Sequence, residues 1–172
     1  MKILETDRLI LRRLERADAE FVFTLVNDPA WLRYIGDRGV RTLADAVDYI
    51  LQGPVQSYER YGFGLYLTEL RASGVPIGIC GLLKRETLPD VDLGFALLPQ
   101  FWGNGYAHES AAAVLAWGKN TFQLERIVAI TSPENHPSIK VLEKLDFKFE
   151  ALIRLSAEAP EVMLFANNNS RT

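Results

Sequence analysis

The chain has 172 residues, of which 48% are hydrophobic and 24% are charged, and its formal net charge is −3. That apolar content excludes a disordered chain, and the length fits one packed domain but not two ordinary ones. Basic residues form no stripe along the chain, which excludes the usual pattern of a nucleic-acid binder.

The N-terminal part of the chain predicts a strand followed by a helix. Residues 8–14 contain an apolar triplet between charges, which is typical of a short strand. Residues 16–27 repeat apolar side chains at helical spacing. Pro29 is expected to end that helix, and a turn is expected at 31–34.

A second helix is predicted behind Thr42. This threonine is the expected N-cap, and Asp45 occupies the position of the acid in a capping box. Residues 43–51 then form one apolar stripe at helical spacing. The pair Gly53-Pro54 is expected to stop the helix.

The rest of the chain predicts strands with two helices inserted between them. In chain order, the expected strands are 63–70, 77–83, 91–98, 127–131, 147–155 and 161–165. Helices are expected at 105–121 and 137–145. Helices that interrupt a mostly antiparallel sheet predict an α+β fold, a mixed sheet flanked by helices. The strand–helix–strand unit over 91–130 should form a right-handed parallel crossover.

The most informative segment runs from Leu97 to Glu109, at the start of a predicted helix. Gly103 and Gly105 permit positive φ values and leave no Cβ atom to obstruct a ligand near the main chain. The turn presents successive N–H groups, and the helix N-terminus adds about half a positive charge. These features predict an anion site suited to a diphosphate. The alternative is an ordinary capping turn that happens to contain two glycines.

The spacing of this segment excludes two other phosphate-binding motifs. No Gly-Lys-Ser or Gly-Lys-Thr follows the glycines, which excludes a P-loop. The third glycine and the trailing acidic residue of a dinucleotide fingerprint are also missing.

The same segment resembles the pyrophosphate motif Gln/Arg-x-x-Gly-x-Gly/Ala of the GNAT N-acyltransferase superfamily, in the branch of the ribosomal-protein N-terminal acetyltransferases. Two registers fit this motif. Residues 100–105 match it literally, whereas residues 102–107 place Trp first but start the helix where the fold needs it. We favour the second register. The resemblance then implies that the cofactor is bound by Trp102, Gly103, Asn104, Gly105, Tyr106 and Ala107.

Two further segments resemble the same branch, so that the resemblance spans nearly the whole chain. Residues 4–12 resemble its opening pattern, and residues 132–147 resemble the second cofactor motif of the family. This second motif implies that Asn135 binds the pantetheine amides and that Ser138 hydrogen-bonds or protonates the coenzyme sulfur. Otherwise each is an ordinary helix-start residue. Asp146 stands where the family usually has Gly, and Asp tolerates the left-handed conformation better than most residues.

The resemblance implies a GNAT-like acyl-CoA N-acyltransferase fold, acetyl-CoA as cosubstrate, and direct attack of an amine on the thioester in a ternary complex. Asp92 is the implied base, acting through a water, and the alternative is a solvated carboxylate on a sheet face. The main chain near Leu97 or Leu98 is expected to bind the thioester carbonyl, where the central strands splay apart. Cys80 has no neighbouring histidine in the sequence and is interpreted as a core residue rather than a nucleophile.

The acceptor implied by the resemblance is a small-molecule amine or a protein N-terminus. Trp31, Tyr34 and Tyr58 are candidates for the border of its cleft, and the alternative is that they are simple core or rim aromatics. A non-catalytic acyl-CoA-binding sensor or scaffold is the competing function, and a purely structural interaction domain is the third. A homodimer is left open.

Other features of the sequence bear on location and metals. No apolar run is long enough to cross a bilayer, and the first eight residues carry charges where a secretory signal has an apolar core. One cysteine and two histidines make a poor metal set, so no metal is expected. We expect a cytoplasmic protein without nucleic-acid or membrane partners. One N-acetyltransferase domain is expected over residues 1–166 and a disordered tail over residues 167–172.

Overall fold

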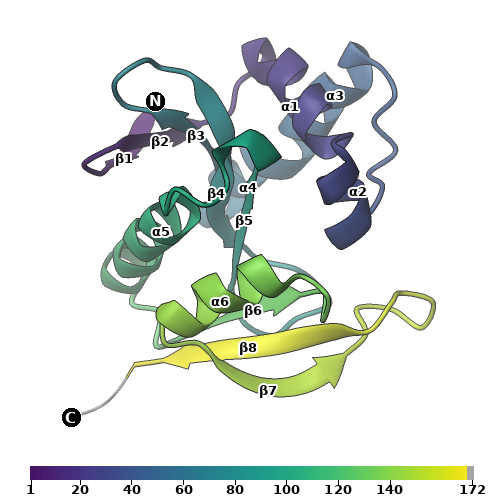
Figure 1. Ribbon diagram of the computed structural model, residues 1–172, viewed down its shortest axis with the longest axis vertical. Coiled ribbons are helices and arrows are strands. Elements are labelled where there is room, and N and C mark those ends of the chain that lie inside the picture. Colours follow the sequence, from purple (N-terminus) through teal and green to yellow (C-terminus); the bar gives the residue numbers. More distant parts are fainter. Residues whose placement is uncertain (170–172) are drawn as a thin grey trace.

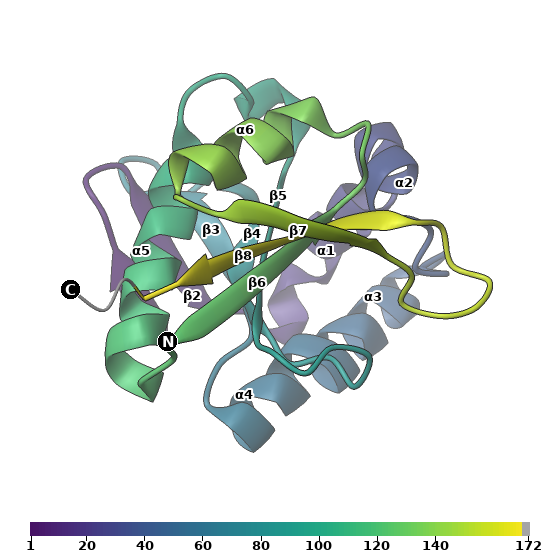
Figure 2. The same ribbon diagram turned by 90° about the horizontal axis from the view of Figure 1, so that it is seen from below.

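A computed structural model of the protein describes residues 1–169 and centres on an eight-stranded sheet (Figures 1 and 2). The strands lie in the spatial order β1-β2-β3-β4-β5-β6-β8-β7. All neighbours pair antiparallel except β5 and β6, which are parallel. The strands are β1 (Lys2–Glu5), β2 (Leu9–Arg13), β3 (Leu65–Leu70), β4 (Pro76–Leu83), β5 (Asp92–Leu97), β6 (Arg126–Thr131), β7 (Lys148–Ile153) and β8 (Val162–Asn168). The predicted α+β fold is therefore confirmed.

Helices cover both faces of this sheet. They are α1 (Ala19–Val26), α2 (Pro29–Tyr34), α3 (Leu43–Ile50), α4 (Gln56–Tyr61), α5 (Tyr106–Phe122) and α6 (His136–Lys144). Figure 1 shows α5 on one side of β4 and β5, and α1 to α3 on the other. Helix α5 connects β5 to β6, and the parallel pairing of these two strands agrees with the expected crossover.

Successive residues of β4 show how the sheet separates two apolar layers. Ile79 packs in the cluster under α1 and α3, whereas Cys80 and Leu82 pack in the cluster under α5. Side chains alternate between the faces of a strand, so one apolar run supplies both layers. Helix α5 approaches closely because its Gly118 has no side chain: a Cβ atom there would lie 2.6 Å from Leu82 Cδ1.

The helix predicted over residues 16–27 ends before Pro29 as expected, at Val26, but two other predictions at prolines in the helical region are wrong. Pro29 does not lead into a turn but occupies the first position of α2, where Asp28 accepts the N–H of Ala30 (2.9 Å). A proline suits that position because the first N–H of a helix has no partner to lose. Gly53-Pro54 does not stop α3 either. The chain continues through a π-helical turn, Leu51–Val55, directly into α4.

Two predictions from local capping chemistry are confirmed. Thr42 caps α3: its hydroxyl accepts the N–H of Asp45 (3.1 Å), and the Asp45 carboxylate accepts the N–H of Thr42 (2.9 Å). After α6, Asp146 adopts the left-handed conformation with φ of 63°. The left-handed conformation that Asp146 was predicted to tolerate therefore occurs at this position.

The predicted disordered tail begins too early. Asn167 and Asn168 belong to β8, and Asn167 is buried. The Asn167 side chain donates to the carbonyl of Leu145 (2.8 Å) and accepts from the Lys119 ammonium. Residues 170–172 of that prediction lie outside the described residues. Within the described chain, no helix combines the length and apolar character needed to span a bilayer.

Candidate active site

The parallel strands β5 and β6 diverge after one registered pair, and the opening between them is the centre of the candidate site. Asp92 pairs with Val128, and no later residue of β5 pairs with β6. Two cavities, of about 620 and 330 Å³, adjoin this opening. Seven residues line both of them: Trp31, Tyr34, Ile35, Phe95, Ala96, Asn135 and Ser138.

The opening leaves main-chain donors of β5 without a partner strand. The N–H of Leu98 donates to the carbonyl of Ile77 on β4 (2.9 Å), so it is not available as the expected thioester donor. Alternate residues of an antiparallel pair direct their N–H groups to opposite edges. The N–H groups of Phe95 and Leu97 therefore face the opening, and both residues line the smaller cavity. Of the two expected donors, the structure favours Leu97, and it adds Phe95.

The glycine-bearing turn forms one wall of the smaller cavity. Gly103 and Gly105 have φ values of 78° and 81°, in the left-handed region that glycine tolerates. The first backbone hydrogen bond of α5 joins Glu109 N–H to Gly105 O (3.0 Å), so the N–H groups of residues 106–108 have no partner within the helix. A Cβ atom on Gly103 would have no heavy atom within 4 Å. The turn therefore exposes a helix N-terminus beside open space.

Two side chains of the turn hold it in shape. The indole N–H of Trp102 donates to the carbonyl of Leu97 (2.9 Å), which ties the turn to the end of β5. The side-chain amide of Asn104 donates to the carbonyls of Phe101 (3.3 Å) and Trp102 (3.1 Å). Trp102, Gly103, Gly105, Tyr106 and Ala107 line the smaller cavity, whereas Asn104 lines neither cavity. Asn104 can therefore contribute a main-chain group or shape, but not its amide.

Arg8 is a further residue that supports this turn, although it is far from it in the sequence, and the sequence did not reveal this role. It donates from Nη1 to the carbonyl of Asn104 (2.9 Å) and from Nε to Oε2 of Glu109 (2.7 Å). Its guanidinium also lies 4.5 Å from the ring centre of Tyr106, and Thr6 donates to Glu109 Oε1 (2.6 Å). Glu109 accepts hydrogen bonds from both Thr6 and Arg8, so it joins the residues before β2 to the first turn of α5. The only sequence signal was the position of Arg8 in the opening pattern.

The start of α6 forms the opposite wall, where both cavities meet. Asn135 is the N-cap, and its side-chain oxygen accepts the N–H of Ser138 (3.3 Å). Within residues 1–169 the Ser138 hydroxyl makes no hydrogen bond to another group of the chain, so it is free to bind a ligand. The capping alternative for Asn135 is therefore real, but a side-chain amide can cap with its oxygen and donate with its nitrogen.

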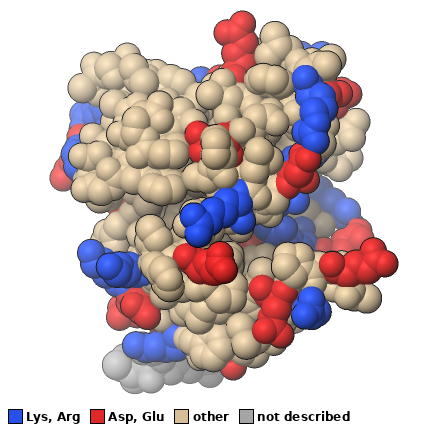
Figure 3. Space-filling view, turned by 45° about the vertical axis from the view of Figure 1, so that its right-hand side comes forward, with Lys and Arg blue, Asp and Glu red and all other residues tan. Residues whose placement is uncertain are grey.

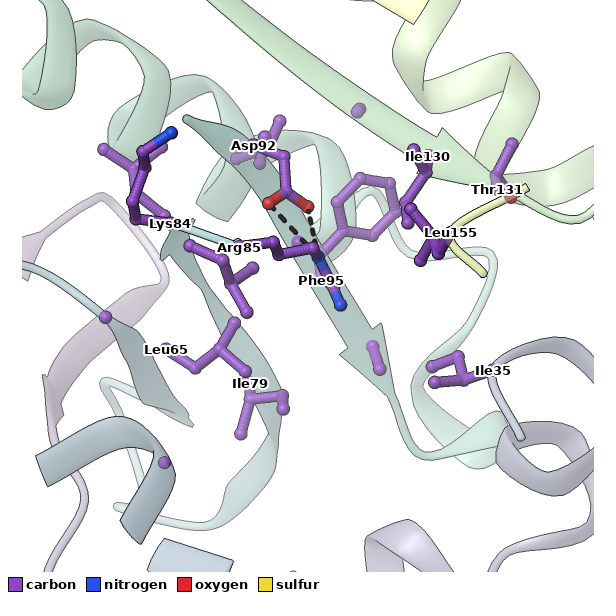
Figure 4. Close-up of a pocket in the computed structure, with 18 of the residues that line it drawn as sticks. Ile35, Leu65, Ile79, Lys84, Arg85, Asp92, Phe95, Ile130, Thr131 and Leu155 are labelled. Atoms are coloured by element: carbon purple, nitrogen blue, oxygen red, sulfur yellow. Dashed lines mark hydrogen bonds and ion pairs between the residues drawn. The ribbon is translucent and has the colours of Figure 1, made fainter. Parts of the chain in front are cut away.

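Asp92 lies at the point where β5 and β6 part, and it lines the larger cavity (Figure 4). Its side chain is 1% exposed, which rules out the solvated carboxylate that was the alternative. Nε of Arg85 lies 3.3 Å from each carboxylate oxygen. Burial raises the pKa of Asp92, and the positive charges of Arg85 and Lys84 oppose that shift. A buried carboxylate with a raised pKa is a stronger base than an ordinary aspartate, which suits it to accept a proton.

The predictions for the three aromatic residues and for Cys80 have different outcomes. Trp31 and Tyr34 line both cavities, as expected for the border of a cleft. Tyr58 does not: it is buried in the core, where its hydroxyl accepts the N–H of Leu14 (3.2 Å) and donates to the carbonyl of Leu65. Cys80 is fully buried, and burial raises its pKa to about 12, so it is a poor nucleophile.

Together these features define an acyltransferase-like site: unpaired main-chain donors, a helix N-terminus, a free hydroxyl and a buried carboxylate around two adjoining cavities. The sequence model of the acetyltransferase (GNAT) domain matches residues 8–148. The chain therefore belongs to the GNAT acetyltransferase family, as its motifs implied.

Similar proteins agree with this assignment. The chain is 32% identical over 158 residues to an uncharacterized N-acetyltransferase, p20, of Bacillus licheniformis, which covers 90% of this chain and 86% of p20. It is 31% identical over 154 residues to the uncharacterized protein YkkB of Bacillus subtilis, covering 88% of each chain.

Solved structures share the fold over nearly the whole chain. An acetyltransferase from Agrobacterium tumefaciens superposes with a TM-score of 0.82 at 26% identity, covering 96% of this chain and 94% of that one. A ribosomal L7/L12 α-N-protein acetyltransferase in complex with coenzyme A superposes with a TM-score of 0.82 at 20% identity, covering 98% of each chain. At this level of identity, the similarity shows only that the two proteins share a fold. As a GNAT member, the protein is an N-acetyltransferase, and the enzymes of this family use acetyl-CoA.

Proposed function

We propose that the protein transfers the acetyl group of acetyl-CoA to a primary amine, by direct attack of the amine in a ternary complex in the cytoplasm. The observation that carries the proposal is the meeting of two cavities at the opening between β5 and β6. One cavity adjoins an exposed helix N-terminus and the other adjoins a buried carboxylate. A donor and an acceptor bound in these two spaces would meet at the opening, where Asn135 and Ser138 line both.

The smaller cavity fits a coenzyme A diphosphate. The N–H groups of residues 106–108 have no helical partner, and the turn at Gly103 and Gly105 lets a ligand approach the main chain. Lys140 and Lys144 of α6 line the same cavity and add positive charge. A helix N-terminus with free N–H groups is a general anion site. The proposed cofactor residues are Leu97, Trp102, Gly103, Asn104, Gly105, Tyr106, Ala107 and Asn135, with Phe95 added and Leu98 left out.

Each remaining group has a role that follows from its place. When bound, acetyl-CoA supplies the acetyl thioester. The N–H groups of Phe95 and Leu97 donate hydrogen bonds to its carbonyl oxygen, which gains negative charge during attack. Asp92 accepts the proton that the attacking amine must lose, directly or through a water. The Ser138 hydroxyl donates to the sulfur that leaves.

The test combines coenzyme binding with turnover. Isothermal titration measures the affinity for coenzyme A, and a thiol-release assay measures turnover of acetyl-CoA over a panel of amines. We expect both binding and amine-dependent release. Binding without release for any amine would leave the competing function, a coenzyme-binding sensor or scaffold. Mass spectrometry of acetylated products from cells that overexpress the protein would separate small amines from protein N-termini.

A further inference from the structure

The larger cavity carries an excess of positive charge, although the chain as a whole has a net charge of −3. Two acidic side chains line it, Glu86 and Asp92. Four basic side chains line it: Arg38, Arg60, Lys84 and Arg85. On the face shown in Figure 3, blue side chains are set back in the hollow between the upper and lower halves of the molecule. A cavity of this sign attracts an anionic ligand.

Two of the four basic side chains are already engaged. The Lys84 ammonium donates to the carbonyls of Leu88 (3.1 Å) and Pro89 (2.7 Å), so it points away from a ligand. In Figure 4 its nitrogen lies apart from the Asp92 carboxylate. The Arg60 guanidinium lies 5.1 Å from the ring centre of Tyr61. These contacts occupy the Lys84 ammonium and part of the Arg60 guanidinium.

The other two basic side chains have donors to spare. Within residues 1–169 Arg38 makes no hydrogen bond and no ion pair. Arg85 uses only Nε on Asp92, at 3.3 Å from each oxygen. Its two terminal nitrogens, Nη1 and Nη2, have no partner in the described chain. A guanidinium has five donor hydrogens in a fixed plane, so Arg85 can hold Asp92 and a ligand anion at the same time.

Tyr49 of α3 lines the same cavity as these two arginines. Its hydroxyl makes no hydrogen bond to another described residue. Burial raises the pKa of Tyr49, and the positive charges of Arg38 and Arg85 oppose that shift. Arg38, Tyr49 and Arg85 thus form a group of residues with unpartnered donors that line one cavity from three separate segments, and Arg85 contacts the proposed base.

We propose that this group binds a carboxylate of the acceptor, so that the substrate is an amine with a carboxylate a few bonds away. The inference rests on the acetyl transfer proposed above. Because one rigid guanidinium contacts Asp92 through Nε and offers Nη to the carboxylate, the amine and the carboxylate must lie close together in the acceptor. The α-carboxylate of a free amino acid meets this requirement. So does an acidic side chain on the first residue of a polypeptide.

The test compares matched acceptors that differ in one charge. A set of free amino acids is assayed by thiol release beside the corresponding carboxamides. A second arm uses short peptides whose first residue is Asp or Glu, beside Asn or Gln. We expect the charged acceptor of one arm to have a kcat/KM about tenfold or more above its neutral partner, as for a charge-assisted hydrogen bond. The arm that shows the preference identifies the source of the carboxylate.

Variants then locate the preference. Arg38→Ala should lower the charged-to-neutral ratio by about tenfold, and Tyr49→Phe should lower it by a smaller factor. Arg16→Ala is the control, because this substitution also removes one positive charge. Arg16 is exposed and lines neither cavity. Titration of the N-acetylated products, charged against neutral, into the coenzyme A complex checks the same preference without turnover.

The outcomes separate this inference from the function on which it rests. Equal kcat/KM values for charged and neutral acceptors in both arms would overturn the carboxylate site and leave acetyl transfer intact. A preference that survives unchanged in Arg38→Ala and Tyr49→Phe would also overturn it. No release with any amine, together with normal coenzyme binding, would instead reject the transfer reaction.

Discussion

Gly105 permits a direct test of the proposed diphosphate site, because one substitution there can be made with or without a charge. Gly105→Glu and Gly105→Gln add side chains of nearly the same size to the start of α5. Both force a residue with a Cβ atom into a φ of 81°. Only the glutamate places a negative charge beside the N–H groups of residues 106–108. The difference between the two variants therefore isolates electrostatics from strain and bulk.

The expected magnitudes follow from this geometry. The left-handed conformation costs either variant about 1–2 kcal/mol of folding stability. The new Cβ atom would lie 3.3 Å from Nη2 of Arg8, the flexible end of a side chain that can shift. A unit charge about 5 Å from a phosphate, at an effective dielectric constant of about 20, costs about 3 kcal/mol. That cost corresponds to roughly a hundredfold weaker coenzyme binding for Gly105→Glu than for Gly105→Gln.

Isothermal titration with coenzyme A, at low and at high salt, measures this difference. The gap between the two variants should narrow at high salt, because screening weakens exposed charge–charge interactions. Gly103→Ala measures the cost of strain through its free energy of unfolding, since its φ is 78° and its Cβ atom would have no heavy atom within 4 Å. Equal affinities for Gly105→Glu and Gly105→Gln would mean that no anion binds at this turn, and the proposed site would be wrong.

Four further outcomes are expected. Asp92→Asn should lower kcat by about a hundredfold or more while the Kd for coenzyme A stays within about twofold; an unchanged kcat removes Asp92 from the mechanism. Burial raises the pKa of Asp92, so kcat should decrease as the pH is lowered through a value above the pKa of an ordinary aspartate. Arg85→Ala should move this acid limb of the pH profile to higher pH, because it removes the positive charge that opposes the shift. An acid limb that does not move would assign the titration to another group. Arg8→Ala should weaken coenzyme A binding by about tenfold, because it frees the turn, and unchanged titration would make Arg8 a purely structural residue. Asn167→Ala should lower the free energy of unfolding in urea by about 1–3 kcal/mol, because the buried carbonyl of Leu145 loses its donor, whereas no change would support the tail predicted from the sequence.

Predictions that depended on neighbouring residues held best. Thr42 and Asp45 lie three positions apart, and their mutual hydrogen bonds close within one helical turn. Gly103 and Gly105 take the positive φ values that their lack of a Cβ atom allows. In each case the interacting groups are connected by a short stretch of chain, so residue type and spacing carry the necessary information.

Predictions about where elements end failed when packing opposed a local signal. Gly53-Pro54 reads as a stop, yet Pro54 is buried and the chain crosses it in a π-helical turn into α4. Asn167 reads as tail, yet it is buried in β8 with partners 22 and 48 positions away. Gly, Pro and Asn weaken helices and strands by only a few kcal/mol, and tertiary contacts can exceed that amount.

By itself, the sequence determined the α+β class, the family motifs and the glycine-bearing turn at the start of α5, because these depend on periodicity and on the backbone freedom of particular residues. Tertiary structure alone decided which main-chain N–H groups face the opening, since that depends on the register of β5 with β4. It also decided that Arg8 supports the turn from 96 positions away and that Arg38, Tyr49 and Arg85 line one cavity. Such side chains carry no mark in the sequence, because their partners are chosen only when distant segments pack together.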